Sequence, residues 1–206
     1  MKVKICGLRT EEAVLAAEDA GADFLGFIFY EKSHRHVLPE EVRGLTKHVQ
    51  RAKTVGVFVD APLDEVNAAA DFCGLDFVQL HGHESAAYAR AVCRPVIKAF
   101  RWGDDFSAEE ANDYPAEIIL LDSFSKDAVG GTGQRFRWRE AAEETARLEK
   151  PLLVAGGIAS GNVREAEEVF RPYGVDVSGS LEIEKRKSIE RIREFMAVVQ
   201  KRRVPE

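Results

Sequence analysis

The sequence is poor in the features that mark membrane, exported and nucleic-acid-binding proteins. None of its apolar runs approaches the roughly 20 residues that a membrane-spanning helix requires. The start, Met1–Lys4, lacks the apolar segment of a secretory signal. The formal net charge of −6 opposes the basic footprint of a nucleic-acid-binding surface. The chain is therefore expected to have neither a membrane nor a nucleic acid as a partner.

Cysteine is also scarce. The chain has only Cys6, Cys73 and Cys93, which are far apart and form no C-x-x-C pair. This number and spacing exclude a disulfide framework and a zinc ribbon, so a reducing cytoplasm is the expected location. The histidines considered as metal ligands are His34, His36, His81 and His83. They lack the H-E-x-x-H pattern, and no metal site is predicted.

Eight short β-rich runs alternate along the chain with segments of helical periodicity. The runs are Val3–Cys6, Phe24–Phe29, Thr54–Val59, Phe77–Leu80, Val96–Phe100, Ile118–Leu121, Leu152–Ala155 and Val175–Ser178. The clearest helical segments are Glu11–Ala20, Leu63–Phe72, Glu84–Cys93, Asn162–Phe170 and about Ser188–Arg202. Such alternation implies parallel strands joined by crossover helices.

Eight units in 206 residues predict one α/β domain over residues 1–206, a small (β/α)₈ or TIM barrel. The alternative is an open doubly wound sheet. That fold usually has fewer units and carries G-x-G-x-x-G after its first strand, where this chain has Cys6-Gly7-Leu8-Arg9. The barrel is therefore favoured.

Strand parity sorts the side chains into two faces, because successive residues of a strand point to opposite sides. We expect the aliphatic face to meet the helices and the polar face to point into the barrel. The residues predicted to converge inside are Lys4, Cys6, Gln79, His81, Asp122, Asp176 and Ser178. The first and eighth strands become neighbours when the barrel closes, so Lys4 and Asp176 are predicted to form an internal ion pair.

Two of these residues stand at strand ends, where barrels of this kind carry their active sites. Cys6 ends the first strand and Asp122 follows the sixth, so they face each other across the mouth as candidate base and acid. The Lys4 ammonium is expected to favour the thiolate form of Cys6. The alternatives are structural: Cys6 is a small buried core residue, or Asp122 caps the turn that follows it.

Glycine-rich segments follow the last three strands: Gly130–Gly133, Gly156-Gly157 and Ser178-Gly179-Ser180. Glycine lets backbone N–H groups approach an anion closely, and the loops after strands seven and eight commonly hold phosphate. The basic segment Lys32–His36 follows the second strand. It suits a carboxylate or a phosphate, or it is an ordinary solvated loop.

Together these segments resemble the phosphoribosylanthranilate isomerase family. The matching landmarks, in order, are Lys4-Ile5-Cys6-Gly7-Leu8; Gly26–Phe29 with Ser33 and Arg35; Gln79–Gly82 with Glu84; Leu121-Asp122; Gly130–Gly133 with Phe136 and Trp138; Ala155-Gly156-Gly157; and Val175–Ser178 with Glu182. They span nearly the whole chain. The family departs from this chain at Ser178-Gly179-Ser180, where it usually reads Ser-Ser-Gly, and at His34, where proline is frequent.

The resemblance implies a single (β/α)₈ barrel of tryptophan biosynthesis. Its reaction is the Amadori rearrangement of N-(5'-phosphoribosyl)anthranilate to 1-(2-carboxyphenylamino)-1-deoxyribulose 5-phosphate, without a cofactor. By resemblance, Asp122 is the general acid and Cys6 the general base. Arg35 would hold the anthranilate carboxylate, His81 and Asp176 would line the sugar site, and backbone amides around Gly156, Gly157, Ser178 and Gly179 would bind phosphate. The implied partner is this small phosphorylated substrate, and the sequence does not distinguish a monomer from a homodimer.

Three other functions compete with this one at the level of sequence, and the chain does not match the first two. A ribulose-phosphate epimerase would carry His and Asp metal ligands at its strand ends, and the chain does not display them. An indole-glycerol-phosphate synthase would show catalytic Lys and Glu residues and a longer N-terminal extension. A non-catalytic phosphosugar-binding barrel would keep the glycine loops but would not need both Cys6 and Asp122.

Overall fold

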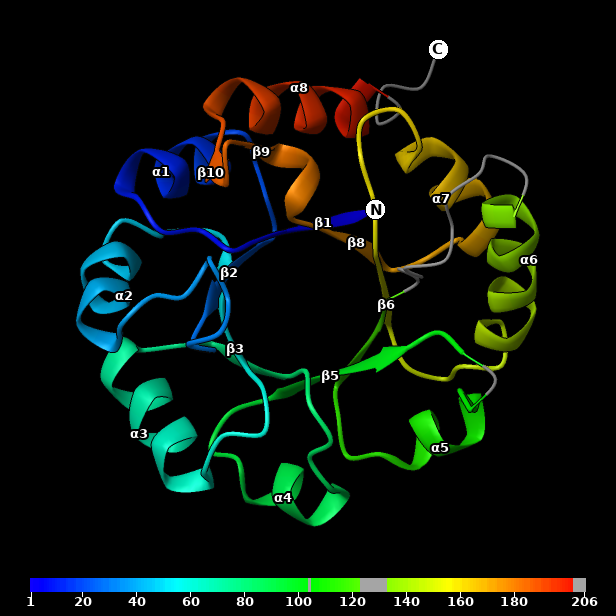
Figure 1. Cartoon of the computed structure of the whole chain (residues 1–206), viewed down its shortest axis with the longest axis horizontal. Coiled ribbons are helices and arrows are strands. Elements are labelled where there is room, and N and C mark those ends of the chain that lie inside the picture. Colours follow the sequence, from blue (N-terminus) through cyan, green and yellow to red (C-terminus); the bar gives the residue numbers. More distant parts are fainter. Residues whose placement is uncertain (104, 123–132, 202–206) are drawn as a thin grey trace.

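A computed structural model shows a closed barrel of parallel strands surrounded by helices (Figure 1), and it describes residues 1–103, 105–122 and 133–201. The strands are β1 (Lys2–Cys6), β2 (Phe24–Ile28), β3 (Lys53–Phe58), β4 (Phe77–Leu80), β5 (Val96–Arg101), β6 (Ile118–Asp122), β7 (Leu152–Ala155) and β8 (Gly174–Val177). Each pairs with the next and β8 pairs with β1, which confirms the predicted (β/α)₈ barrel.

The main helices alternate with the strands. They are α1 (Glu11–Asp19), α2 (Pro39–Thr46), α3 (Leu63–Cys73), α4 (Ala86–Ala91), α5 (Ala108–Asp113), α6 (Gly133–Thr145), α7 (Val163–Phe170) and α8 (Ile189–Gln200). The described helices include none with the length and apolar character needed to cross a membrane. Helix α4 is shorter than the predicted Glu84–Cys93, because Ser85 caps its first turn and Val92 already has extended backbone angles.

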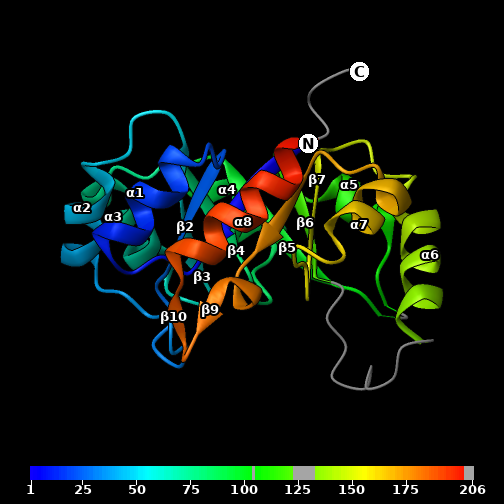
Figure 2. The ribbon, with the colours of Figure 1, turned by 90° about the horizontal axis from the view of Figure 1, so that it is seen from above.

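One additional element is a short two-stranded hairpin between β8 and α8. It follows a single 3₁₀ turn, Gly179–Leu181, and consists of β9 (Glu182–Ile183) paired antiparallel with β10 (Arg186–Lys187). Figure 2 shows this hairpin at the end of the barrel opposite the N-terminus. It therefore lies at the mouth, where the C-terminal ends of the parallel strands also lie.

The core has two parts. One cluster packs the outward faces of the strands, including Val3, Ile5 and Val78, against helix residues such as Val14 and Val66. This confirms the predicted aliphatic outer face. A second cluster lies inside the barrel and consists of Phe24, Val55, Ile97, Ala99, Ile118, Leu120, Leu153 and Ala155. The prediction of a polar inward face is therefore wrong for several strands, because a barrel interior is a packed core away from its mouth.

The end opposite the mouth is held by two matching clamps. Asp23 accepts hydrogen bonds from the Lys2 ammonium at 2.7 Å and from the Val3 backbone N–H at 2.9 Å. Asp76 repeats the arrangement two strands later, with the Lys53 ammonium at 2.8 Å and the Thr54 N–H at 2.9 Å. These clamps join β1 to the start of β2, and β3 to the start of β4, far from the mouth.

Candidate active site

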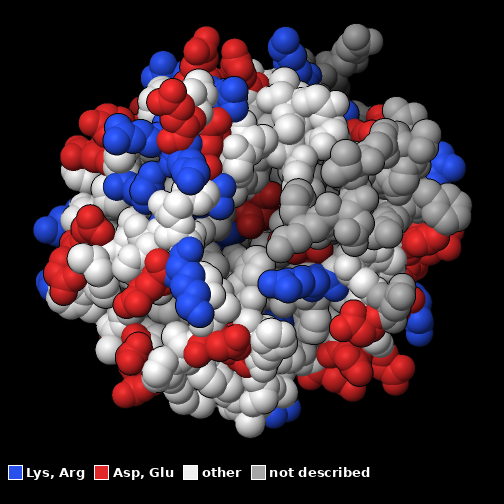
Figure 3. Space-filling view, viewed as in Figure 1, with Lys and Arg blue, Asp and Glu red and all other residues white. Residues whose placement is uncertain are grey.

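A cavity of about 440 Å³ opens at the mouth of the barrel. Figure 3 shows a hollow at the centre of this face, with acidic atoms inside it and Lys and Arg side chains along parts of its rim. The cavity is lined by Cys6, Ile28, Arg35, Val57, Gln79, His81, Asp122, Ala155, Gly156, Gly157, Ile158, Asp176, Ser178, Gly179 and Ser180. All nine residues predicted for the site therefore surround one cavity.

The thiol of Cys6 lies beside a buried ion pair. Lys4 pairs in register with Asp176 across the β1–β8 seam, and its ammonium lies 3.0 Å from the Asp176 carboxylate. This confirms the predicted pair. The register also places Gly26 of β2 opposite Cys6. A Cβ on Gly26 would lie 2.9 Å from the Cys6 sulfur and 3.2 Å from the Lys4 ammonium, so the missing side chain leaves the space that both groups occupy.

The protonation of Cys6 depends on burial more than on the nearby ammonium. Burial raises the pKa of the thiol, the nearby Lys4 lowers it, and Asp176 raises it again, with a net pKa above the ordinary value. Lys4 therefore favours the thiolate, as predicted, but desolvation outweighs the effect of the ammonium. For Lys4 itself, burial lowers the pKa, but the carboxylate and the thiol more than compensate and raise it. At neutral pH Lys4 is protonated and the Cys6 thiol keeps its proton.

Removing the ammonium is expected to raise the pKa of Cys6 further. In a background with Cys73→Ser and Cys93→Ser, Lys4→Met should move the pH dependence of Cys6 alkylation by iodoacetamide to higher pH, because Lys187 alone then opposes burial and Asp176. Lys53→Met removes a similarly paired lysine at the opposite end of the barrel and should leave the profile unchanged. A profile that stays in place or moves to lower pH in Lys4→Met would contradict this account.

Asp122 lies at the end of β6, with His81 as its neighbour. The His81 Nε2 atom is 3.9 Å from Asp122 Oδ2, which is too long for a hydrogen bond. Burial lowers the pKa of His81, although Asp122 and Asp176 oppose that effect. The imidazole is therefore neutral near pH 7, and it places no positive charge beside the Asp122 carboxyl group.

Gln79 sets the orientation of the His81 ring. Its amide nitrogen lies 2.8 Å from Nδ1 of His81. An amide nitrogen only donates, so Nδ1 accepts and the neutral ring carries its proton on Nε2, the atom nearer to Asp122. The amide oxygen of Gln79 is buried without a hydrogen-bond partner among the described residues.

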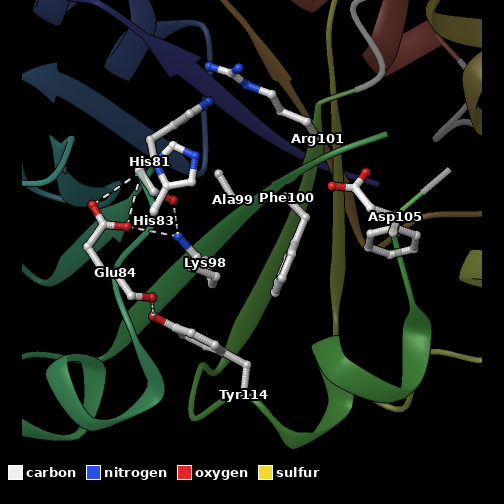
Figure 4. Close-up of a pocket in the computed structure, with 11 residues that line it drawn as sticks. His81, His83, Glu84, Lys98, Ala99, Phe100, Arg101, Asp105 and Tyr114 are labelled. Atoms are coloured by element: carbon white, nitrogen blue, oxygen red, sulfur yellow. Dashed lines mark hydrogen bonds and ion pairs between the residues drawn. The ribbon is translucent and has the colours of Figure 1, made fainter. Parts of the chain in front are cut away.

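The loop that carries His81 is anchored by a second buried ion pair. The Lys98 ammonium lies 2.8 Å from the Glu84 carboxylate and also donates to the backbone carbonyl of Gly82 at 2.6 Å. Glu84 accepts further hydrogen bonds from the N–H groups of Asp60 and Gly82. Figure 4 shows Glu84 and Lys98 pointing toward one another in a neighbouring cavity of about 480 Å³, which His81 also lines. This pair fixes the β4 loop against the β3 loop.

The glycine loops form the opposite wall of the site. Gly156 and Gly157 have φ angles of 86° and 72°, a left-handed conformation that only glycine adopts without strain. Ser180 donates to the Ile158 carbonyl at 2.6 Å, which ties the β8 loop to the β7 loop. Of the glycine-rich segment after β6, positions 130–132 lie outside the described residues.

Arg35 lies between the β1 and β8 loops rather than in open solvent. A Cβ on Gly7 would lie 2.4 Å from its Cδ, and a Cβ on Gly179 would lie 3.4 Å from its Nη2. Its guanidinium donates to both carboxylate oxygens of Glu182, from Nε at 2.5 Å and from Nη2 at 2.8 Å. The side chain thus reaches the cavity in a fixed orientation.

The sequence reasoning missed three residues beside the site. In the sequence, Gly26 and Glu182 are only landmarks of the resemblance; the structure places Gly26 opposite Cys6 and Glu182 against Arg35. Lys187 has no predicted role, because a lysine in a short hairpin gives no periodic signal. Gln79 was expected inside the barrel from strand parity and does line the cavity. Among the described residues, no three His, Cys, Asp or Glu side chains are grouped to hold a metal ion.

The closed parallel barrel and the thiol, imidazole and carboxyl groups that meet at its mouth define the protein as a (β/α)₈-barrel enzyme. Residues 3–198 match the model of the N-(5'-phosphoribosyl)anthranilate isomerase family. The chain belongs to this family.

Known relatives cover almost the whole chain. It is 47% identical over 205 residues to N-(5'-phosphoribosyl)anthranilate isomerase from Geobacter sp. strain M21, covering 97% of this chain and 98% of that one. Phosphoribosyl anthranilate isomerase from Thermotoga maritima superposes with a TM-score of 0.87 at 34% identity, covering 98% and 99% of the two chains. A phosphoribosyl anthranilate isomerase solved with reduced 1-(o-carboxyphenylamino)-1-deoxyribulose 5-phosphate superposes with a TM-score of 0.85 at 32% identity, with the same coverage.

Proposed function

We propose that the protein converts N-(5'-phosphoribosyl)anthranilate to 1-(2-carboxyphenylamino)-1-deoxyribulose 5-phosphate in L-tryptophan biosynthesis, with Asp122 as acid and Cys6 as base. The observation that carries the proposal is the single cavity around which all nine predicted site residues lie. Family membership supports the substrate, since the relatives carry the name of this activity.

The first step opens the ribose ring. The Asp122 carboxyl group gives its proton to the ring oxygen, the bond from that oxygen to C1' breaks, and the nitrogen lone pair forms a protonated Schiff base. The neutral His81 beside Asp122 favours this role, because an imidazolium at the same place would hold the carboxyl group in its ionised form.

In the second step the Cys6 thiolate removes the proton from C2'. The C–H electrons form a C1'–C2' double bond and neutralise the Schiff base, which gives an enolamine that tautomerises to the ketone. The raised pKa of Cys6 means that little thiolate exists at neutral pH, and each unit above the ambient pH adds about 1.4 kcal/mol to the barrier. The same property makes the thiolate a stronger base toward carbon once it forms.

The remaining residues bind the two charged ends and the sugar between them. Arg35 holds the anthranilate carboxylate, and His81 with Asp176 lines the sugar. Backbone N–H groups of the β7 and β8 loops, around Gly156, Gly157, Ser178 and Gly179, bind the phosphate. The left-handed angles of Gly156 and Gly157 support this assignment, because such turns present N–H groups to an anion. The steps above move only protons and electron pairs between the substrate, Asp122 and Cys6, so they call for no cofactor.

The direct test follows the fluorescence of N-(5'-phosphoribosyl)anthranilate, made in place from anthranilate and phosphoribosyl pyrophosphate by a coupling transferase. The purified protein should remove the signal in proportion to its concentration. A signal that decays only at the rate of the protein-free sample would contradict the proposed function. If the protein were a non-catalytic phosphosugar-binding barrel, the decay would also stay unchanged. Phosphate binding would then still raise the melting temperature of the protein.

A further inference from the structure

We infer that Glu182 is a positioning residue that fixes the guanidinium of Arg35 so that one edge faces the substrate carboxylate. The inference rests on the proposed role of Arg35 and adds a residue that acts through it. Glu182 lies in β9, and its side chain is 8% exposed. Although 147 positions separate the two residues, the fold brings their charged groups into direct contact.

Geometry decides which part of Arg35 is left for a ligand. A guanidinium has two edges that match a carboxylate, one formed by Nε and one Nη, and one formed by both Nη atoms. Glu182 occupies the first edge through Nε and Nη2. In the described part of the chain, Nη1 of Arg35 has no hydrogen-bond partner. The edge formed by both Nη atoms is therefore the one presented to a carboxylate in the cavity that Arg35 lines.

Glu182 is itself held in place from the other side. The Lys187 ammonium, on the paired strand β10, lies 2.7 Å from the same oxygen that accepts from Arg35 Nε. Burial raises the pKa of Glu182, but the hydrogen bonds from Arg35 and Lys187 lower it to about 2. The carboxylate is thus ionised throughout the working range of pH and keeps both partners.

The same network reaches the β8 loop and the first strand. Lys187 also donates to the backbone oxygen of Ser178 at 3.1 Å, and the Ser178 hydroxyl donates to the Cys6 carbonyl at 2.9 Å. The short hairpin therefore connects the residue proposed to bind carboxylate with the loop proposed to bind phosphate. Among these described residues, Glu182 is the only side chain that accepts hydrogen bonds from both Arg35 and Lys187.

The test is a double-mutant cycle of Glu182→Gln and Arg35→Ala, measured by steady-state turnover of phosphoribosylanthranilate. The glutamine keeps the shape but turns an amide N–H₂ toward the Arg35 donors. KM is expected to rise about tenfold with kcat unchanged, which corresponds to loss of one charge-assisted hydrogen bond. In the Arg35→Ala background, Glu182→Gln should add no further rise in KM. Glu190→Gln removes an equal charge from an exposed position of helix α8 and should behave as wild type.

The outcomes separate the inference from the proposed function. If the wild-type protein has no activity, or Arg35→Ala leaves KM unchanged, the proposed function or the role of Arg35 is wrong. If Arg35→Ala raises KM but Glu182→Gln does not, or if their effects simply add, the positioning role is wrong. Glu182→Asp keeps the charge but shortens the side chain, so it should also raise KM. If thermal unfolding shows that the Glu182→Gln variant does not fold, the KM of Glu182→Asp tests the inference instead.

Discussion

Replacing Cys6 with serine is expected to lower kcat by about 10³- to 10⁴-fold, at the upper end of what general-base catalysis contributes. The serine hydroxyl is close in size, but it is a far weaker acid, and its alkoxide is not accessible at neutral pH. Inorganic phosphate should bind to this variant as to the wild type, because the β7 and β8 loops are unchanged. Stopped assays at high enzyme concentration and calorimetric titration with phosphate measure the two properties.

Cys93→Ser is the matched control for this experiment. Cys93 is exposed and lies outside the cavity, so its replacement should leave turnover unchanged. If Cys6→Ser keeps wild-type turnover, the thiol is a core residue and another group removes the C2' proton. A large loss of both turnover and phosphate binding would point instead to a distorted mouth.

The second large effect is expected for Asp122→Asn, which should lower kcat by about 10²- to 10⁴-fold, since the amide cannot give a proton to the ring oxygen. Steady-state turnover of N-(5'-phosphoribosyl)anthranilate at saturating substrate measures this loss.

The competing view holds that Asp122 is only a cap for the turn after β6. In that case Asp122→Asn should lower the melting temperature and leave kcat close to wild type. Asp113→Asn, an exposed aspartate at the end of α5, controls for the loss of one negative charge. The acid assignment requires the opposite result, with turnover lost and stability kept.

Much of the fold and the main site follow from simple periodicities. The parity of β1 and β8 predicted the Lys4–Asp176 pair, because closure of the barrel brings the first and last strands into register. The rule that the strand ends of a barrel carry its chemistry predicted Cys6 and Asp122, and both line the cavity. These inferences needed only the order of the residues, the alternation of side chains along a strand, and closure of the barrel.

Three features depended on information that no single stretch of sequence carries. The pKa of Cys6 depends on two opposing effects, since desolvation raises it and the nearby ammonium lowers it. The degree of burial decides which effect is larger. The role of Gly26 depends on the register between β1 and β2. The contact of Glu182 with Arg35 arises from a hairpin of two-residue strands, which is too short for any periodic pattern.

The burial of Cys6 also affects how readily the protein is damaged by oxidants. Peroxide attacks the thiolate, and susceptibility grows with solvent access. Cys6 is 5% exposed and has a raised pKa, so both conditions for attack are suppressed. Cys93 is exposed and meets dissolved oxidants first. The barrel therefore protects the sulfur proposed for chemistry from sulfenic and sulfinic acid formation without a resolving cysteine beside it.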